Sequence, residues 1–283
     1  MENRIHIIGL VVPDLTDTHF AKVASGVARI MQPRGYTVLI SNSEGDADAE
    51  RHAIDLLLSC SHVEGLILAS AQAPNETALF RRLEKHKMPF VLLDRDFPAA
   101  AANFVGSDDE EIGWVATEHL ISRGCRHIAH IEGPATSAAA GRARGYTAAL
   151  GGHGLRSADG YVVRGGSSDA AGYEAMRRLL SVNPRLDGVV CYNDAVAVGA
   201  IKAILEAGLE VPYDIEVVGA GNVHYSDILR VPLSTVDLNS VTAGERAAEL
   251  LLGVLESPEP RPPERVLIPF ELVARESSKA VAV

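Results

Sequence analysis

Pairs of polar residues follow two of the predicted buried strands, and their side chains could hold a small polar ligand. Asp94 and Arg95 come directly after the apolar segment 90–93, and Asn193 and Asp194 come directly after a second apolar segment. The carboxyl ends of parallel strands gather loops and helix N-termini, so residues at these places are well positioned to bind ligands. Carboxylate, guanidinium and amide groups together both accept and donate hydrogen bonds. The pattern therefore predicts a binding site at strand ends.

Both pairs also have structural interpretations. Asn and Asp are favoured N-cap residues, and Asn193 and Asp194 stand where a predicted helix at 195–207 begins, so either side chain can cap that helix. Asp94 and Arg95 can instead form an ion pair with each other at the surface, which would contribute little. Because this second pair ends a strand, we favour the ligand-binding interpretation for it.

Catalytic and metal-binding patterns are missing from the sequence. It contains no G-x-S-x-G nucleophile motif, no H-E-x-x-H zinc motif and no G-x-x-x-x-G-K phosphate loop. His127 and His130 are three positions apart on a predicted strand, so they face opposite sides and cannot share a metal ion simply. Gly219 and Gly221 lack the third glycine of a dinucleotide site. We therefore expect no enzyme, no metal and no cofactor.

Composition and charge narrow the class of protein. Hydrophobic residues make up 47% of the 283 residues and charged residues 22%, which fits two lobes of ordinary domain size. A formal net charge of −11 would repel a phosphate backbone, so this chain alone should not bind DNA. The three cysteines are scattered, no signal peptide precedes the first apolar segment, and no apolar run is long enough to span a membrane. We therefore expect a cytoplasmic location.

Short apolar segments alternate with helical patterns along the chain, which is typical of parallel sheets built from βαβ units. The predicted strands are 5–12, 36–40, 65–69, 90–94, 128–132, 160–164, 188–192, 215–219 and 266–273. The predicted helices are 20–31, 47–61, 76–86, 110–123, 142–151, 170–181, 195–207 and 243–255. One doubly wound lobe is complete at residue 94, a second begins after residue 105, and the proline-dense segment 257–264 should cross between them.

The loops that follow these strands carry short motifs in a fixed order. They are IGLVVPD at 8–14, DR at 94–95, SD at 107–108, TEHL at 117–120 with RG at 123–124, GP at 133–134, Arg142 with GY at 145–146, ND at 193–194 with Gly199, and PFELVARES at 269–277. Each motif is weak by itself. Together they make the chain similar, over essentially its whole length, to the lactose-repressor (LacI) family of transcription regulators and its relatives, the periplasmic sugar-binding proteins.

The resemblance implies an α/β fold of the periplasmic-binding-protein-like type I, with two doubly wound parallel-sheet subdomains joined by three crossover strands. The N-terminal effector-binding subdomain would comprise residues 1–106 and 238–262, and the C-terminal one residues 107–237 and 263–283. A homodimer is also implied, as is a small-molecule effector, sugar-like or anionic, that closes the lobes by binding in the cleft. In the family a helix-turn-helix head precedes such a core and binds operator DNA. Here we expect that head to be absent, so that operator DNA is reached only through a segment outside this chain.

The resemblance also assigns ligand contacts. It places Asp94 and Arg95 in the cleft. It matches Arg142 to a ligand-binding arginine of the family, whose planar fork suits hydroxyl, carboxylate or carbonyl oxygens. The alternative for Arg142 is a solvated arginine at a helix start. By the same resemblance, Asn193 binds the ligand and Asp194 caps the following helix.

Further positions differ from the sugar-binding members of the family. Phe20 matches an aromatic residue that covers a ligand ring, although core packing is an equal alternative, and His19 stands where a second aromatic residue is common. Gly221, which we keep among the ligand-binding positions, replaces an acidic residue. Ala69 and Leu238 replace an asparagine and a glutamine. A site stripped of these polar groups should not favour a bare pentose or hexose.

The alternative function is a periplasmic sugar-type binding protein of a transport system, and an enzyme on this fold is a more distant one. The absence of a leader favours a regulator, as does the ending at 270–277, which looks like a regulator's final strand. The sequence therefore predicts the effector-binding and dimerisation core of a LacI-family transcription regulator.

Overall fold

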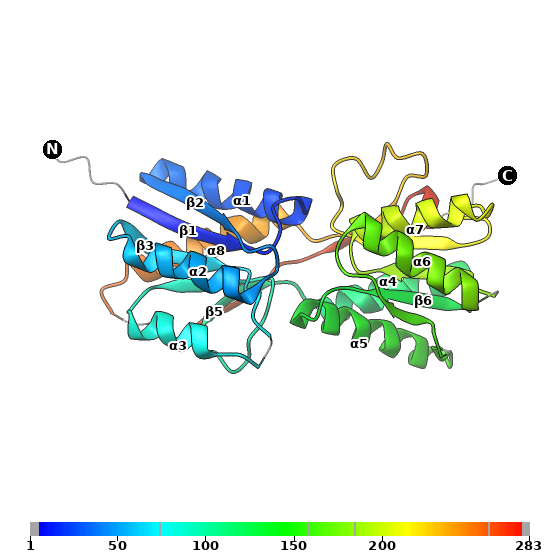
Figure 1. Ribbon diagram of the computed structural model, residues 1–283, viewed down its shortest axis with the longest axis horizontal. Coiled ribbons are helices and arrows are strands. Elements are labelled where there is room, and N and C mark those ends of the chain that lie inside the picture. Colours follow the sequence, from blue (N-terminus) through cyan, green and yellow to red (C-terminus); the bar gives the residue numbers. More distant parts are fainter. Residues whose placement is uncertain (1–5, 74, 158, 184, 260, 279–283) are drawn as a thin grey trace. The chain divides into compact units, whose positions relative to one another are not determined.

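The chain forms two α/β units in a computed structural model that describes residues 6–73, 75–157, 159–183, 185–259 and 261–278 (Figure 1). Unit 1 comprises Met1–Ser107 and Asn239–Ile268, and unit 2 comprises Asp108–Leu238 and Pro269–Val283. The chain therefore passes from one unit to the other three times. Neither unit is continuous in sequence.

Unit 1 alternates strands with helices. Its strands are β1 (His6–Val12), β2 (Tyr36–Asn42), β3 (Val63–Leu68), β4 (Phe90–Leu93), β5 (Asn103–Gly106) and β11 (Arg265–Leu267). Its helices are α1 (Thr18–Met31), α2 (Ala47–Ser59), α3 (Ala78–Lys85) and α8 (Ser240–Leu255), with a 3-10 turn η1 (Gln32–Arg34) after α1. The carboxylates of Asp17 and Asp46 accept hydrogen bonds from the first turns of α1 and α2, so each helix begins where the sequence supplies a cap.

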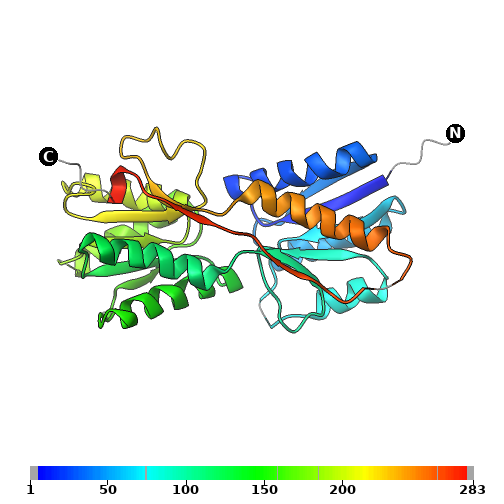
Figure 2. The ribbon, with the colours of Figure 1, turned by 180° about the vertical axis from the view of Figure 1, so that it is seen from behind.

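The sheet of unit 1 is parallel and has the strand order β11-β5-β4-β3-β1-β2. Alternate residues of β1 point to opposite faces. Ile8 and Leu10 lie in a core with α1 and α8, whereas Val11 lies in a core with α2 and α3. Figure 1 shows α2 and α3 in front of the sheet, and Figure 2 shows α8 on the other side. Both faces are covered, so the strands read as continuous apolar runs.

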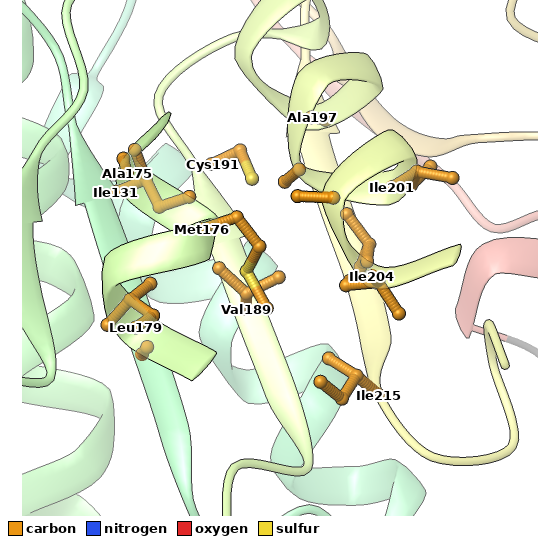
Figure 3. Packing of buried hydrophobic residues seen from close by; sticks show 14 of the residues in the cluster. Ile131, Ala175, Met176, Leu179, Val189, Cys191, Ala197, Ile201, Ile204 and Ile215 are labelled. Atoms are coloured by element: carbon orange, nitrogen blue, oxygen red, sulfur yellow. The ribbon is translucent and has the colours of Figure 1, made fainter. Parts of the chain in front are cut away.

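Unit 2 repeats the pattern. Its strands are β6 (Ile128–Glu132), β7 (Val162–Arg164), β8 (Gly188–Cys191), β9 (Glu216–Ala220), β10 (Ser234–Asp237) and β12 (Glu271–Val273). Its helices are α4 (Asp109–Arg123), α5 (Ser137–Gly152), α6 (Asp169–Val182) and α7 (Asp194–Glu206), with a final 3-10 turn η2 (Glu276–Ser278). The strand order β12-β10-β9-β8-β6-β7 matches that of unit 1, except that β12 is antiparallel to its neighbour β10. Figure 3 shows one of its cores, in which Met176 of α6 and Ile204 of α7 pack on Val189 of β8.

Three helix pairs approach each other closely through glycine: α1 with α8, α4 with α5, and α6 with α7. The glycines at these contacts are Gly26 and Gly244, Gly113 and Gly145, and Gly172 and Gly199. A Cβ atom built on any of them would lie between 1.9 and 2.2 Å from a carbonyl oxygen of the opposite helix. These distances are far below van der Waals contact, so each pair requires glycine on both helices.

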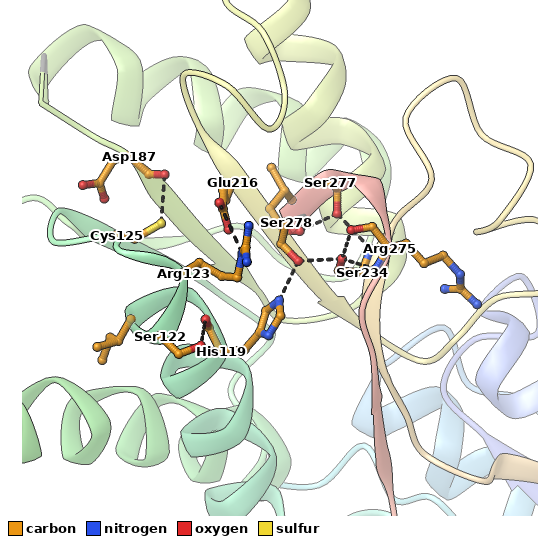
Figure 4. Close-up of polar contacts among 12 residues, drawn as sticks. His119, Ser122, Arg123, Cys125, Asp187, Glu216, Ser234, Arg275, Ser277 and Ser278 are labelled. Atoms are coloured by element: carbon orange, nitrogen blue, oxygen red, sulfur yellow. Dashed lines mark hydrogen bonds and ion pairs between the residues drawn. The ribbon is translucent and has the colours of Figure 1, made fainter. Parts of the chain in front are cut away.

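The C-terminal segment is tied to unit 2 by serine hydroxyls (Figure 4). Ser277 Oγ donates to the carbonyl of Val217 at 2.6 Å. Ser278 Oγ lies 2.7 Å from Nε2 of His119 and 2.6 Å from Oγ of Ser234. The residues 275–278 therefore form part of the packed structure of this unit and not a loose tail.

The structure differs from the sequence prediction in several elements. The predicted strand at 266–273 is two short strands that belong to different sheets, β11 and β12, so residues 263–268 group with unit 1 and not with the second subdomain. The short strands β5 and β10 were not predicted. Helix α5 begins at Ser137 and not at Arg142, because Thr136 caps it by accepting from the amide of Ala139.

Candidate functional site

In unit 1 the strands β1 and β4 end next to the side chains of His19 and Asp94. Asp94 follows β4 with a φ of +62°, a left-handed conformation that Asp tolerates better than most residues. Its Oδ1 lies 3.4 Å from Nε2 of His19, and Nδ1 of the same ring lies 2.9 Å from Oγ of Ser240. The carboxylate and the imidazole, each less than one-sixth exposed, thus form one polar group at this edge of the sheet.

Arg95 does not pair with Asp94 on the surface, which was its structural alternative. It is buried, with 8% of its surface exposed, and its Nη1 donates to the carbonyl of Ser70 at 2.8 Å. The carboxylate of Glu50, in the first turn of α2, contacts Ala71, the residue that follows Ser70. Oε2 of Glu50 accepts from the amide of Ala71 at 2.8 Å. Burial raises the pKa of Glu50, while the hydrogen bonds of Ser70, Gln72 and Ala71 and the charge of Arg95 lower it.

Glu50 was missed by the sequence prediction. The sequence shows only that Glu50 lies in the first turn of a predicted helix. The helix dipole favours an acidic residue there whether or not that residue belongs to a site. The sequence does not show whether Glu50 is solvated or buried, because the loop 69–73 that covers its carboxylate is distant in the chain.

Phe20 and Ala69 belong to the core of unit 1. Phe20 is 6% exposed and packs with Val23 and Val27 of α1 against the sheet, and Ala69 is in the same cluster. Of the two interpretations of Phe20, its position agrees with core packing. Its ring also meets the ring of His19 edge-on at a centroid distance of 4.8 Å, so it supports that imidazole.

In unit 2, Arg142 lies inside α5 and not before a helix. It is 5% exposed, its Nη1 donates to the carbonyl of Tyr192 at 2.6 Å, and its Nε donates to Asp109 at 3.0 Å. The guanidinium also lies 4.9 Å from the centroid of the Tyr192 ring. The solvated-arginine alternative is therefore wrong. Replacing Arg142 would remove one hydrogen bond to the partly buried carboxylate of Asp109 and one to the carbonyl of Tyr192.

The cap assigned to Asp194 has to be corrected, whereas the ligand contact of Asn193 stays a prediction. Asn193 is the N-cap of α7, because its Oδ1 accepts from the amide of Val196 at 2.9 Å. Asp194 instead accepts from the amide of Val223 at 2.8 Å and from the hydroxyl of Thr235 at 2.6 Å. Asn193 and not Asp194 caps α7 because the helix begins one residue earlier than predicted. Asp194 holds the loop after β9.

Gly221 opens that loop with a φ of +132°, which side-chain-bearing residues rarely adopt. A Cβ atom at this position would have Oδ2 of Asp194 as its nearest neighbour, at 3.6 Å. A carboxylate introduced at Gly221 would therefore meet an existing one on a strained backbone. The next residue, Asn222, donates to Asp237 at 2.8 Å and accepts from Nη2 of Arg275 at 2.8 Å. Leu238 is buried in a core cluster of unit 2.

The structure thus brings the predicted residues into two sets. His19, Asp94 and Arg95 lie at one edge of unit 1, and Arg142, Asn193 and Gly221 are held by strand ends and helix starts of unit 2. Among the described residues, no group of three or more His, Cys, Asp or Glu side chains could hold a metal ion. No helix in the described part of the chain is long and apolar enough to cross a membrane.

A family model matches residues 5–276 and is described as periplasmic binding proteins and sugar binding domain of LacI family. The chain belongs to the LacI family. It is 31% identical to an HTH-type transcriptional repressor PurR of Aliivibrio fischeri over 254 residues, which cover 88% of this chain and 74% of that protein. It is also 31% identical to the ribose operon repressor of Escherichia coli K12, over 90% of this chain and 77% of that protein.

Solved structures agree with this membership. A transcriptional regulator CelR–cellobiose complex superposes with a TM-score of 0.88 at 26% identity, covering 98% of this chain and 86% of the other. A LacI family transcriptional regulator from Mycobacterium smegmatis has a TM-score of 0.85 at 31% identity, covering 95% and 98%. The chain therefore has the fold of the effector-binding domain of LacI-family regulators. The alternative of an uptake protein is not better supported, since these relatives are repressors and regulators.

Proposed function

We propose that this chain senses a small molecule for a cytoplasmic transcription regulator and transmits its binding to operator DNA through a helix-turn-helix segment outside the chain. The observation that carries the proposal is the family membership, together with buried polar side chains at the strand ends of both units. The relatives are named as repressors, one of them as helix-turn-helix type. The net charge of −11 supports an indirect route to DNA, because a chain of that net charge is repelled by a phosphate backbone.

The effector would contact Asp94 and His19 in unit 1 and the Arg142 and Asn193 region in unit 2. That one effector touches both units stays a prediction, as does lobe closure as the signal. Relatives include a ribose operon repressor and a cellobiose complex, so D-ribose and cellobiose are the first neutral ligands to try. The absence of polar side chains at Ala69 and Leu238 favours a ligand with fewer hydroxyls than these.

The test is calorimetry on a panel of neutral and anionic metabolites, followed by the Asp94→Asn variant. Asn tolerates the positive φ of this position but removes the charge, so the fold should survive. Loss of a charged hydrogen-bond partner should weaken effector binding by about ten- to a hundredfold. Asp96→Asn is the matched control, because that carboxylate is engaged by Arg265 at 2.8 and 3.0 Å. Equal effector affinity in the two variants would contradict the assignment of Asp94.

We further propose a homodimer, and unit 2 offers a surface for it. Val198, Ile201, Leu205, Leu229 and Val231 line an apolar groove of about 380 Å³ between α7 and the loop after β9. Its rim carries charges of both signs, from Lys202, Arg230 and Glu206. A rim of mixed charge suits a self-complementary two-fold contact with a second copy.

A further inference from the structure

Unit 1 has a groove between α8 and the segment 261–266, which we call the α8 groove. Its volume is about 190 Å³. The residues that line it include none of those assigned to the effector. Pockets for drug-sized ligands measure roughly 300–1,000 Å³, so the α8 groove has room only for a smaller molecule.

One wall of the α8 groove is a single face of the helix. The lining positions on α8 are 246, 249, 250, 253 and 254. Steps of three and four residues return to the same face of a helix. Arg246 and Glu249 form an ion pair with each other at 2.5 Å, so their charges are already matched. Leu250 and Val254 supply the apolar surface of this wall.

The opposite wall is the segment 261–266, which is fixed to strand β5 at Glu264. The amide of Glu264 donates to Oδ1 of Asn103 at 2.8 Å, and its carbonyl accepts from the amide of Phe104 at 2.9 Å. The two residues before Glu264 are prolines, whose rings fix their own φ angles. This wall is therefore held in place before any ligand binds.

Arg261 and Glu264 bring opposite charges to this wall. Both side chains line the groove and both residues are exposed. Among the described residues, neither side chain forms an ion pair or a hydrogen bond. The wall thus offers one guanidinium and one carboxylate beside an apolar surface.

Gly253 keeps the α8 groove open. Glycine is among the least favourable residues inside a helix, so its presence there needs a reason. Its φ is not positive, and a Cβ atom on it would have Nη1 of Arg261 as its nearest neighbour, at 4.0 Å. Neither the backbone conformation nor a close approach therefore requires glycine. A larger side chain at this position would occupy the groove itself.

We propose that the α8 groove binds a small zwitterion with an apolar body, which is the chemistry of an apolar amino acid. Its carboxylate pairs with Arg261 and its ammonium group with Glu264, while its apolar body lies on Leu250 and Val254. A simple anion would meet the charge of Glu264, and a simple cation would meet that of Arg261. This inference is independent of the proposed function, because no residue of the candidate site takes part.

The probe is L-leucine, titrated into the whole chain and followed by NMR of the methyl groups. We expect shifts at Leu250, Val254 and Val266, with a dissociation constant on the order of 1 mM. Isocaproate has the same apolar body without the ammonium group, and isoamylamine has it without the carboxylate. Each should bind about two- to fivefold more weakly, since each loses one exposed ion pair.

Two charge variants assign the two ends of the ligand. Arg261→Gln should remove the advantage of L-leucine over isoamylamine and keep its advantage over isocaproate. Glu264→Gln should do the reverse. Arg34→Gln is the control, because Arg34 is exposed in unit 1 and does not line the groove. The proposal is overturned if L-leucine does not shift the three methyl-bearing residues, or if both charge variants behave like Arg34→Gln.

Gly253→Leu should fill the α8 groove and bring L-leucine binding below detection, with an unchanged circular dichroism spectrum. Undiminished binding in a folded Gly253→Leu would place the ligand elsewhere and overturn the proposal. So would a groove that serves a second copy of the chain, which would appear as weaker dimerisation of Gly253→Leu in sedimentation without any binding of L-leucine to wild type. Should Gly253→Leu fail to fold, Arg261→Gln and Glu264→Gln decide.

Discussion

Ionisable side chains inside unit 2 have pKa values set first by burial. Burial lowers the pKa of His130 to about 4, and it raises the pKa of Glu216 to about 7 and that of Cys125 to about 12. Arg123 lies 3.8 Å from Glu216 and lowers its pKa, whereas the charge of Asp187 raises it (Figure 4). Such shifts link protonation to folding, because the same groups return to ordinary pKa values in the unfolded chain.

His130 should make the protein less stable in mild acid. Its Nδ1 donates to the carbonyl of Val190 at 3.0 Å, and its ring stacks on Tyr146, so the folded state holds it neutral. The folded pKa lies below the unfolded value of 6.5, so its stabilising effect is complete above pH 6.5 and is lost as the pH falls toward 4. We expect His130→Phe to abolish about 2.5 kcal/mol of the stability loss between pH 7.5 and 4.5, measured by urea unfolding. Glu216→Gln is the control, because Glu216 shifts in the opposite direction. An unchanged pH dependence in His130→Phe would show that the imidazole is not buried as described.

The cysteines should differ sharply in reactivity toward a thiol reagent. Cys125 and Cys191 are buried and burial raises the pKa of both, whereas Cys60 is partly exposed. The thiolate is the reactive form, so Cys60 should react in the native protein and the other two only after unfolding. Ellman titration with and without denaturant checks this. Native reaction of Cys191 would indicate that the core between β8 and α7 opens readily.

The sequence could place the site residues relative to predicted strands and helices, but it could not show which distant residues contact them. Asp94 and Arg95 could be placed at a strand end from the apolar run before them. The partner of Arg95 could not, because the carbonyl of Ser70 comes to it from the loop after β3. For Arg142 the reason is different: the Ala- and Gly-rich start of α5 has no apolar periodicity, so the helix was placed too late. The cap of α7 was assigned to Asp194 instead of Asn193 because the predicted helix start was one residue late.

The glycine contacts between helices give a prediction at the level of elements. Gly145→Ala should destabilise unit 2 by about 3 kcal/mol, because the new methyl group would lie 1.9 Å from the carbonyl of Glu110 on α4. Gly151→Ala is the control on the same helix, where a Cβ atom would meet nothing within 4 Å. That variant should instead be stabilised by roughly 0.5–1 kcal/mol, since alanine favours helix. Thermal or urea unfolding compares the two, and equal stability would contradict the close approach of α4 and α5.

Elements with a strong apolar pattern were predicted well, and β6 has the predicted bounds 128–132. The short strands β5 and β10 were not, because four residues give too little periodicity and their strand character depends on neighbours in the sheet. The segment 266–273 reads as one strand because its apolar residues are nearly continuous. Only the pairing of Leu267 with Gly106 and of Leu272 with Val236 shows that it serves two sheets.

At the scale of the whole molecule, the proposed homodimer can be tested on the groove of unit 2. Ile228, in the loop beside the groove, is 80% exposed, so replacing it should not disturb the fold of the unit. We expect wild type to sediment as a dimer at micromolar concentration, and Ile228→Asp to raise the dimer dissociation constant at least about tenfold. Val182→Asp is the control, because Val182 is 62% exposed on α6 and does not line the groove. A monomeric wild type, or equal behaviour of the two variants, would contradict this interface.

The discontinuity of both units has a consequence for synthesis on the ribosome. The segment 108–238 contains α4 to α7 and five of the six strands of unit 2, all within one stretch of the chain. Unit 1 begins first but lacks α8 until residue 255 has been made, and until then the surface of α1 around Gly26 has no partner. At about 5–20 residues per second, that surface stays uncovered for several seconds or longer. The half of the molecule that is translated first is therefore completed after most of the other half, and nascent chains released before α8 expose an apolar helix face to chaperones and proteases.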